Sequence, residues 1–335
     1  MGRYVIRRLL QALLTLAFAL FLLHYLTSLS IQINGNPAYA FFGGKITPTP
    51  AQLQAVAEMY NTDDPCLTQP GNPCFGNFVE RIGDYATGDF GKDLRQRPVT
   101  ELVAERIPNT LRIFAVSTAV WALAGIGLGM AAAVRREKLT DYVIRIGSMV
   151  SSAIPVFLMV LALKYIAGIW IGGWFRENLG EDNALSIIFL PSFDDEHPWL
   201  TILVPGVALS AIGTAGIARL MRTSMLENLR ADFVRTARAK GLKPRRVLIA
   251  HTLRNSLIPV VTLIGLSFGG ALGGAVITEG LWNIRGVGQL VFNAVRQNDT
   301  PIVIAVVTML VVCYLGFSLI VDLLYAVLDP RIRYE

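Results

Sequence analysis

Residues 111–134 read LRIFAVSTAVWALAGIGLGMAAAV and contain one charged side chain, that of Arg112. Two further arginines, Arg135 and Arg136, follow directly. Because an α-helix rises about 1.5 Å per residue, about 20 apolar residues are enough to cross the hydrocarbon core of a bilayer. The stretch therefore predicts a membrane-spanning helix with a basic end.

Five more stretches have the same character, so the chain is predicted to be an all-α integral membrane protein with six transmembrane helices. The composition agrees, because only 16% of the 335 residues are charged, whereas soluble domains carry about 25%. In chain order, the expected spans are 9–30, 111–134, 146–171, 200–220, 257–277 and 302–327.

The positions of lysine and arginine predict how the chain is oriented. The segment 172–199 has one base, Arg176, against six acids. By the positive-inside rule, both termini are expected in the cytoplasm. Since the bases flank apolar segments, the net charge of +6 indicates no nucleic-acid partner. The bases on the cytoplasmic side are Arg3, Arg7, Arg8, those within 135–145 and 222–254, Arg331 and Arg333.

This orientation divides the chain into three parts. Residues 1–30 form the first transmembrane helix, residues 31–106 an extracytoplasmic cap, and residues 107–335 a five-helix core with a cytoplasmic loop at 221–256. A cleavable signal peptide ending near Ala38-Tyr39-Ala40 is the alternative for the first helix. Its apolar run is longer than a usual signal peptide requires, which favours a retained helix.

Two cysteines lie close together in the expected cap. Asp64-Pro-Cys66 and Asn72-Pro-Cys74 flank a turn at Pro70-Gly71. Outside the cytoplasm such a pair can oxidise, and the short loop suits a bridge. We favour a Cys66–Cys74 disulfide over two free thiols.

Glycines and two charges stand out within the spans. Gly125 and Gly129 are four residues apart, as are Gly269 and Gly273, and Gly270 and Gly274 repeat the spacing. This spacing indicates close helix packing rather than a substrate site. We expect Lys164 to extend outward to the membrane surface, and Asp322 to pair within the bundle or lie near its inner face.

The most informative cytoplasmic stretch is ADFVRTARAKG, residues 231–241. Phe233, Ala237 and Gly241 share one face of a predicted helix, with Val234 beside them. Gly241 is a suitable helix stop, and Pro244 is a suitable start for the next helix. The remaining positions include Arg235, Arg238 and Lys240.

Two interpretations of this helix–turn–helix are open from the residues alone. A short helix with a small-residue face can insert into a groove on a partner protein, and Ala237 would allow close approach. The basic residues could instead bind anionic lipid headgroups.

The motifs themselves resemble a known family. The spacing from Ala237 to Gly241, before a helix ending at Ile258-Pro259, resembles the EAA loop of ABC importer permeases. More closely, RTARAKGL at 235–242 and RNSLIP at 254–259 are similar to the B-type subunit of the dipeptide/oligopeptide permease family. Further matching motifs, spread over nearly the whole chain, are Asn36-Pro-Ala38, Gly88-Asp-Phe-Gly91, Arg97-Pro-Val99, Arg106-Ile-Pro-Asn-Thr-Leu111, Glu279, Gly286-Val-Gly288 and residues 321–331.

The chain departs from the family pattern at three places. Arg235 stands where the loop motif begins with Glu, a substitution usual in this subfamily. The stretch from Cys66 to Cys74 looks like an insertion. Asn283-Ile-Arg285 occupies a place where the family often has a proline.

The resemblance implies an ABC-importer permease subunit in a bacterial or archaeal cell membrane, for peptides or similar small solutes. Its implied partners are a homologous permease subunit, two ATPase subunits, an extracytoplasmic solute-binding protein and membrane lipid. The residues implied in ATPase coupling are Phe233, Val234, Arg235, Ala237, Arg238 and Gly241.

No catalytic residue, cofactor or metal is expected in this chain itself. Because it has no G-x-x-x-x-G-K-[ST] sequence, ATP and Mg²⁺ are expected in the partner ATPases. The alternative is a secondary transporter or channel without ATPases, which would predict internal repeats and charged or broken helices at mid-membrane. An embedded enzyme has less support.

Overall fold

The computed structural model describes residues 2–33, 48–50, 53–54, 65–93, 97–297 and 300–328. These residues are helical apart from connecting turns and one isolated bridge between Lys92 and Pro98. They group into two compact units, Met1–Pro108 with Gly286–Glu335, and Asn109–Arg285. This grouping by contact does not test the predicted division at 31–106 and 107–335, which concerns the side of the membrane.

Some expectations fall outside the described residues. Ala38-Tyr39-Ala40 is among them, as is most of the polar stretch 31–64. The side chain of Asp322 and the surroundings of Gly269 and Gly270 are also not described.

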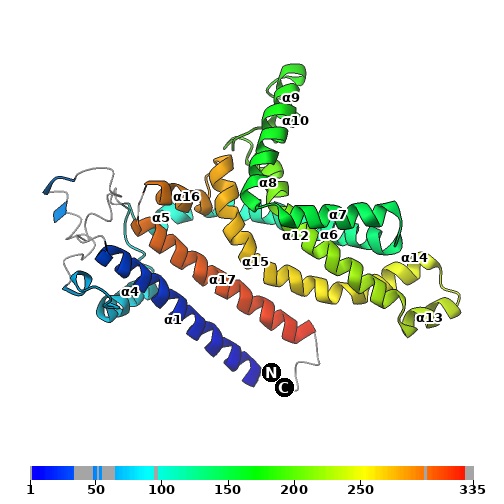
Figure 1. The fold of residues 1–335 in the computed structure, drawn as a ribbon, viewed down its shortest axis with the longest axis horizontal. Coiled ribbons are helices and arrows are strands. Elements are labelled where there is room, and N and C mark those ends of the chain that lie inside the picture. The colour runs from blue at the N-terminus through cyan, green and yellow to red at the C-terminus, as the bar shows by residue number, and fades with distance from the viewer. Residues whose placement is uncertain are drawn as a thin grey trace. The chain divides into compact units, whose positions relative to one another are not determined.

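The first unit is built on two long apolar helices, α1 and α17, which run side by side (Figure 1). Helix α16 packs on α17, and so does α5. The elements of this unit are α1 (Gly2–Ile33), η1 (Pro65–Thr68), α4 (Phe75–Thr87), α5 (Val99–Ala104), α16 (Val287–Gln297) and α17 (Thr300–Leu328).

The predicted Cys66–Cys74 disulfide is present in this unit. Two polar side chains of α1 hold the disulfide loop. The Gln32 amide donates to the Asn72 carbonyl at 2.9 Å, and the buried His24 ring lies 3.2 Å from the Cys74 carbonyl. Phe75, the first residue of α4, stacks on α1 through Phe21. The loop is thus tied to α1 by hydrogen bonds and an aromatic contact.

The second unit is organised around α12, which packs against α7, α8 and α15. Its elements are most of α6 (Ile107–Val134), then α7 (Leu139–Ala153), α8 (Val156–Leu163), the π-helix η2 (Lys164–Ile171), α9 (Gly172–Leu179), α10 (Ala184–Ile188), α11 (Pro198–Thr201), α12 (Leu203–Leu229), α13 (Asp232–Ala239), α14 (Pro244–Arg246), the π-helix η3 (Val247–Leu253) and α15 (Arg254–Trp282).

Glycines allow the helices of this unit to approach closely. A Cβ at Gly129 of α6 would lie 2.6 Å from the Ala218 carbonyl oxygen of α12, and Gly125 meets the same helix. A Cβ at Gly274 of α15 would lie 2.8 Å from the Leu209 side chain. The packing interpretation is confirmed at these three positions and is wrong at Gly273, where a Cβ would meet no described atom within 4 Å.

Several described helices are long and apolar enough to cross a membrane. Four qualify outright, and a fifth does if the pair Pro198–Ala211 and Gly213–Leu229, bent by 53°, is taken as one span. Residues Ile302–Gly316 form a shorter apolar helix. The chain is therefore a multi-pass membrane protein. The four helices are Ile6–Leu29, Val99–Val134, Val156–Leu179 and Pro244–Gly265.

Two of the predicted boundaries are wrong. The expected span 146–171 is interrupted, because Pro155 disfavours a helical conformation at Ile154, whose ψ is 126°. Figure 1 shows α8 turning away from the direction of α7. The helix expected to end at Pro259 continues instead, since α14, η3 and α15 follow without a gap from Pro244 to Trp282.

Lys164 also differs from its prediction. Its ammonium group donates to the Leu281 carbonyl at 2.5 Å, beside the last residue of α15. Carbonyls in the last turn of a helix lack partners within the helix, and a cation there complements the helix dipole. Lys164 therefore binds a helix end inside the unit rather than extending outward.

Candidate functional site

Helix α13 forms where the sequence predicts it, because its charges suit its ends. Asp232 lies in the first turn and Arg238 in the last, which complements the helix dipole. Ala231 is extended, with φ −69° and ψ 151°, and marks the start of the helix. The hydroxyl of Thr236 donates to the Asp232 carbonyl at 3.0 Å.

Gly241 ends α13 in the predicted way. Its φ is +74°, in the left-handed region that favours glycine. The Gly241 N–H donates to the Arg238 carbonyl at 2.9 Å, and the Leu242 N–H donates to the Ala237 carbonyl at 3.3 Å. These two bonds form a Schellman motif. Pro244 then begins α14, so the chain reverses between two helices as predicted.

The inner face of α13 packs on the same chain. Val234, Ala237 and Val247 form a buried cluster, with Leu242 against it, and Ala237 is only 6% exposed. The Ala237 side chain is therefore covered within its own chain, and its part in ATPase coupling stays a prediction. Its small size allows α13 to approach η3 closely, because the Schellman motif folds Leu242 back over it.

The outer face of α13 carries the groups that remain accessible. Phe233 is 39% exposed, and Arg235 and Arg238 are exposed. Asp232 pairs with Arg235 at 3.3 Å. Further bases follow on the turn and α14, and all are exposed: Lys240, Lys243, Arg245 and Arg246. The face presents one aromatic ring among positive charges, which suits an acidic, partly apolar groove or a layer of anionic lipid. The coupling role of these residues stays a prediction.

A buried ion pair fixes α12, the helix that precedes α13, to α7. Arg222 of α12 binds Asp141 of α7 through two bonds, at 2.6 Å and 2.7 Å. The Asp141 side chain is fully buried, and the Glu137 N–H also donates to it. The hydrogen bonds from Arg222 hold the pKa of Asp141 below its ordinary value, although burial opposes the shift. One turn earlier, Arg219 donates to Ser152 at 2.9 Å.

Sequence reasoning missed this Arg222–Asp141 pair, called the clamp below. From the sequence alone, Arg222 indicates only the cytoplasmic side. A usable signal was present, since Asp141 is an acid in a connection otherwise rich in bases.

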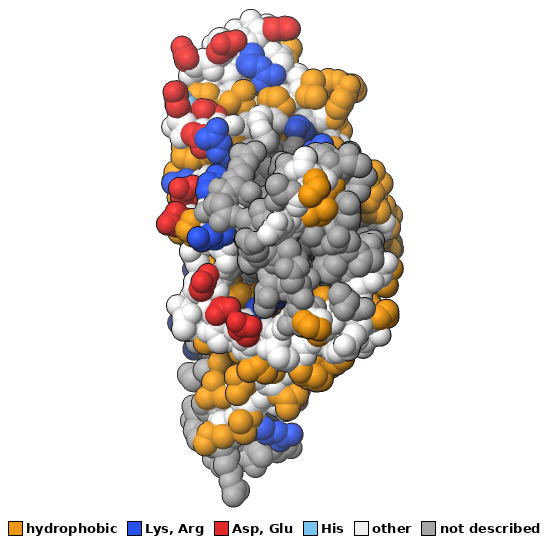
Figure 2. Space-filling view, turned by 90° about the vertical axis from the view of Figure 1, so that its left-hand side faces the viewer, with side chains coloured by type: hydrophobic (Ala, Val, Ile, Leu, Met, Phe, Trp, Pro, Cys, Tyr) orange, Lys and Arg blue, Asp and Glu red, His pale blue; other side chains and the backbone are white. Residues whose placement is uncertain are grey.

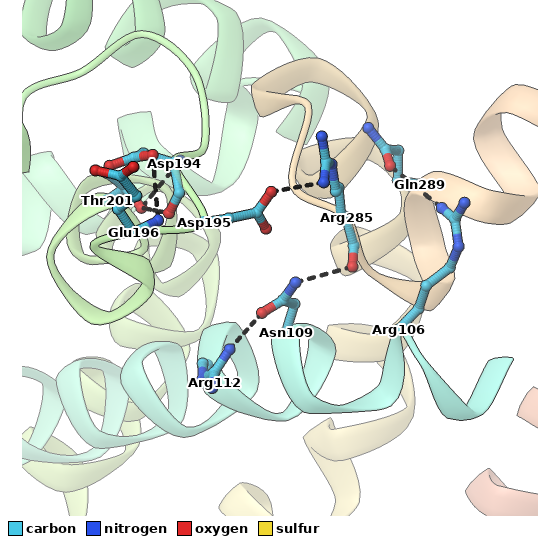
Figure 3. Close-up of polar contacts among 9 residues, drawn as sticks. All are labelled: Arg106, Asn109, Arg112, Asp194, Asp195, Glu196, Thr201, Arg285 and Gln289. Atoms are coloured by element: carbon cyan, nitrogen blue, oxygen red, sulfur yellow. Dashed lines mark hydrogen bonds and ion pairs between the residues drawn. The ribbon is translucent and has the colours of Figure 1, made fainter. Parts of the chain in front are cut away.

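A second polar cluster lies at another part of the unit and includes Asn109 of the 106–111 motif and Arg285, which directly precedes the Gly286-Val-Gly288 motif (Figure 3). Asn109, in the first turns of α6, donates to the Arg285 carbonyl at 3.0 Å, and Arg112 donates to Asn109 at 2.6 Å. The Arg285 side chain reaches Asp195 at 2.6 Å. The cluster joins the start of α6, the loop before α11 and the end of α15.

The connection 172–199 carries its acids on the surface. Glu177, Glu181 and Asp182 are exposed on and between α9 and α10. In Figure 2, acidic side chains gather at the end of the projection that these two helices form in Figure 1. The surface is thus acidic here and basic at α13 and α14, the asymmetry on which the predicted orientation depends.

Replacing Gly241 by alanine is expected to loosen the turn without a steric clash. A Cβ there would meet no atom within 4 Å, so the cost is that of the left-handed backbone, about 1 kcal/mol. Amide hydrogen exchange in residues 232–242 should quicken about fivefold, the factor equivalent to that energy. Gly216→Ala, in open space within α12, is the control. Unchanged exchange in Gly241→Ala would contradict the role given to the turn.

Comparisons with known proteins show which transport proteins the chain is similar to. The chain is 33% identical to the oligopeptide transport system permease protein AppB of Bacillus subtilis over the full length of both. It is 33% identical to the dipeptide transport system permease protein DppB of Alkalihalophilus pseudofirmus, covering 90% of this chain and 91% of that one. It is 31% identical to the Escherichia coli oligopeptide permease OppB over the full length of both.

A family match covers most of the second unit and continues beyond it. Residues 125–334 match the binding-protein-dependent transport system inner membrane component family. The match includes α12, α13, the Gly241 turn and α15, the elements that build the site. The chain therefore belongs to the family of inner membrane components of binding-protein-dependent transport systems.

Proposed function

We propose that this chain is one permease subunit of an ATP-binding-cassette importer that takes up peptides or similar small solutes. The observation that carries the proposal is similarity along the whole chain, at 33% identity, to an oligopeptide transport system permease. The helix–turn–helix at α13 supports it with a surface on which an ATPase could act. The comparisons do not favour a secondary transporter or channel.

In the proposed topology, six helices cross the membrane and both termini are cytoplasmic. Residues 31–106 lie outside and residues 221–256 inside. The distribution of bases and acids supports this orientation, and α17 supplies the sixth span. The disulfide between Cys66 and Cys74 fits an oxidising location outside the cytoplasm.

This topology is open to a labelling test. Single cysteines at positions 60 and 240 are expected to react with a membrane-impermeant maleimide from opposite sides. The exposed Cys313 thiol should first be replaced by serine. Reaction of both positions from the same side would contradict the topology.

The proposed assembly supplies what this chain lacks. A homologous permease subunit completes the pathway between the two chains, and a solute-binding protein delivers the solute from outside. Two ATPase subunits bind ATP and Mg²⁺ on the cytoplasmic side of the two permease subunits. Closure of the ATPases moves α13, and that movement shifts the population from inward-facing to outward-facing states.

Copurification from mild detergent tests the function directly. The tagged chain is expected to bring down a second permease subunit and ATPase subunits, with ATP hydrolysis stimulated by the loaded binding protein. Uptake by the chain alone, driven by an ion gradient, would instead establish the secondary-transporter alternative.

A matched pair of variants locates the ATPase contact within that experiment. Phe233→Ala removes an exposed ring from α13 and is expected to weaken ATPase association. Phe157→Ala removes a similarly exposed ring from α8 and should leave association unchanged. Equal effects of the two changes on ATPase association would show that α13 is not part of the ATPase interface.

A further inference from the structure

A chain of buried hydrogen bonds joins α12, η3 and α15. The amide of Asn228, in the last turn of α12, donates to the Ser256 hydroxyl at 3.1 Å. The Ser256 hydroxyl donates to the Thr252 carbonyl at 2.8 Å, and the Thr252 hydroxyl donates to the Val247 carbonyl at 3.2 Å. Thr252 and Ser256 have no exposed surface. The Thr252 and Ser256 hydroxyls are therefore bonded away from solvent, whereas the partly buried Asn228 amide links Ser256 to α12 and also donates to the Ser224 carbonyl at 2.9 Å.

The hydrogen bond from the Thr252 hydroxyl spans five residues, as do the backbone bonds of the π-helix that contains Thr252. Residues Val247–Leu253 form a π-helix, whose backbone bonds span five residues instead of four. The Thr252 hydroxyl reaches the carbonyl five residues before it, so it supports the wide turn rather than an ordinary α-turn. A single π-turn is equivalent to one inserted residue, and losing it would rotate the segments on either side relative to each other.

The two ends of η3 are fixed to different elements. Val247, its first residue, is buried in the cluster with Val234 and Ala237 of α13. Beyond its last residue, Ser256 lies in the first turn of α15 and is bonded to α12 through Asn228. A displacement of α13 therefore reaches α15 through η3.

We propose that Asn228, Thr252 and Ser256 are positioning residues that set the register of η3, and that η3 is the joint through which α13 turns α15 against α12. The proposal rests on the proposed function, because it requires an ATPase to move α13. A wide turn that can tighten is a two-state element of the kind that converts a small local shift into a helix movement. The buried bonds make the two states distinct, since breaking them leaves polar groups without partners.

Coupling between transport and ATP hydrolysis tests the proposal. The complete importer is reconstituted in liposomes, with labelled trialanine as the probe, and uptake is divided by ATP hydrolysed. Thr252→Val keeps the shape of the side chain but removes the hydroxyl, and Asn228→Leu removes the link to α12. Each is expected to lower the ratio about tenfold, the factor that one buried hydrogen bond can contribute. Thr252→Ser, which keeps the hydroxyl, should restore the ratio.

Two control positions on α15 separate the proposed role in setting the register of η3 from ordinary hydrogen bonding within a helix. The half-buried Thr262 and the exposed Asn255 make ordinary bonds to carbonyls four residues earlier, at 3.1 Å and 2.9 Å. Thr262→Val and Asn255→Leu should leave the ratio unchanged. An unchanged ratio in Thr252→Val and Asn228→Leu, with the complex assembled, overturns the proposal.

A second measurement covers the case in which Thr252→Val does not assemble. Ser256→Ala removes one hydroxyl from this series of hydrogen bonds, and spin labels at the exposed positions 239 and 255 report the separation of α13 from α15. ATP is expected to change this separation with Ser256 present and not in Ser256→Ala, whereas the same change in both overturns the proposal. Absence of ATPase from the unmodified complex would overturn the proposed function instead, so the two failures are distinguishable.

Discussion

Ala237→Trp is expected to abolish coupled transport while the chain remains inserted in the membrane. Ala237 is buried between Val234, Val247 and Leu242, where an indole does not fit. Overpacking of this kind costs about 1–3 kcal/mol, and here it would push α13 away from η3. Transport should fall at least about tenfold, since 1.4 kcal/mol corresponds to a factor of ten. ATPase copurification and solute uptake are the measurements.

The matched control is Ala239→Trp, because Ala239 lies on the same helix but is exposed. It should assemble and transport nearly as well as the unmodified chain. The lipid-binding interpretation predicts a different pattern, in which loss of Arg235 and Arg238 is damaging and Phe233→Ala leaves ATPase association unchanged. Full assembly and transport by Ala237→Trp would show that coupling does not require α13 to pack on η3.

Asp141→Asn is expected to cause the largest loss of stability. Arg222 has 19% of its side chain exposed and makes two short bonds to Asp141. Removing one partner of a buried pair leaves the other charge uncompensated, at a cost of about 3 kcal/mol. Thermal unfolding of the purified chain in detergent measures the loss. Asp232→Asn, which breaks an exposed pair, should cost less than about 1 kcal/mol, the range of an exposed ion pair and of a charge at a helix end.

A double variant shows whether the stability that Asp141→Asn loses comes from the uncompensated charge or from altered packing. Asp141→Leu combined with Arg222→Met removes both charges and should recover most of the stability that Asp141→Asn loses. If the double variant is as unstable as Asp141→Asn, shape rather than charge compensation holds α7 on α12.

The pH dependence of this clamp follows from the direction of the pKa shift. Because the folded pKa of Asp141 is depressed from 3.8, its contribution is present in full above the unfolded value. It is lost as the pH falls through the lower folded pKa. Acidification from pH 7 to about 5 should leave the clamp intact, with loss only below about pH 4.

The sequence by itself determined the local features of this protein. Long apolar stretches predict the membrane helices because span length follows from helix rise and bilayer thickness. Gly241 and Pro244 predict the α13 turn because the motif needs a left-handed residue followed by a helix start. The ordered motifs identified the family, and the expected Cys66–Cys74 bridge joins residues eight apart.

Only the tertiary structure decided which faces meet. Arg222 and Asp141 are 81 residues apart, and Lys164 and Leu281 are 117 apart. Whether Ala237 faces a partner or its own chain depends on how α13 is rotated against η3. Helical periodicity defines a face but not what covers it, because rotation and register are set by packing among all the helices. For this reason the turn was predictable, whereas the clamp, the Lys164 contact and the inward face of α13 were not.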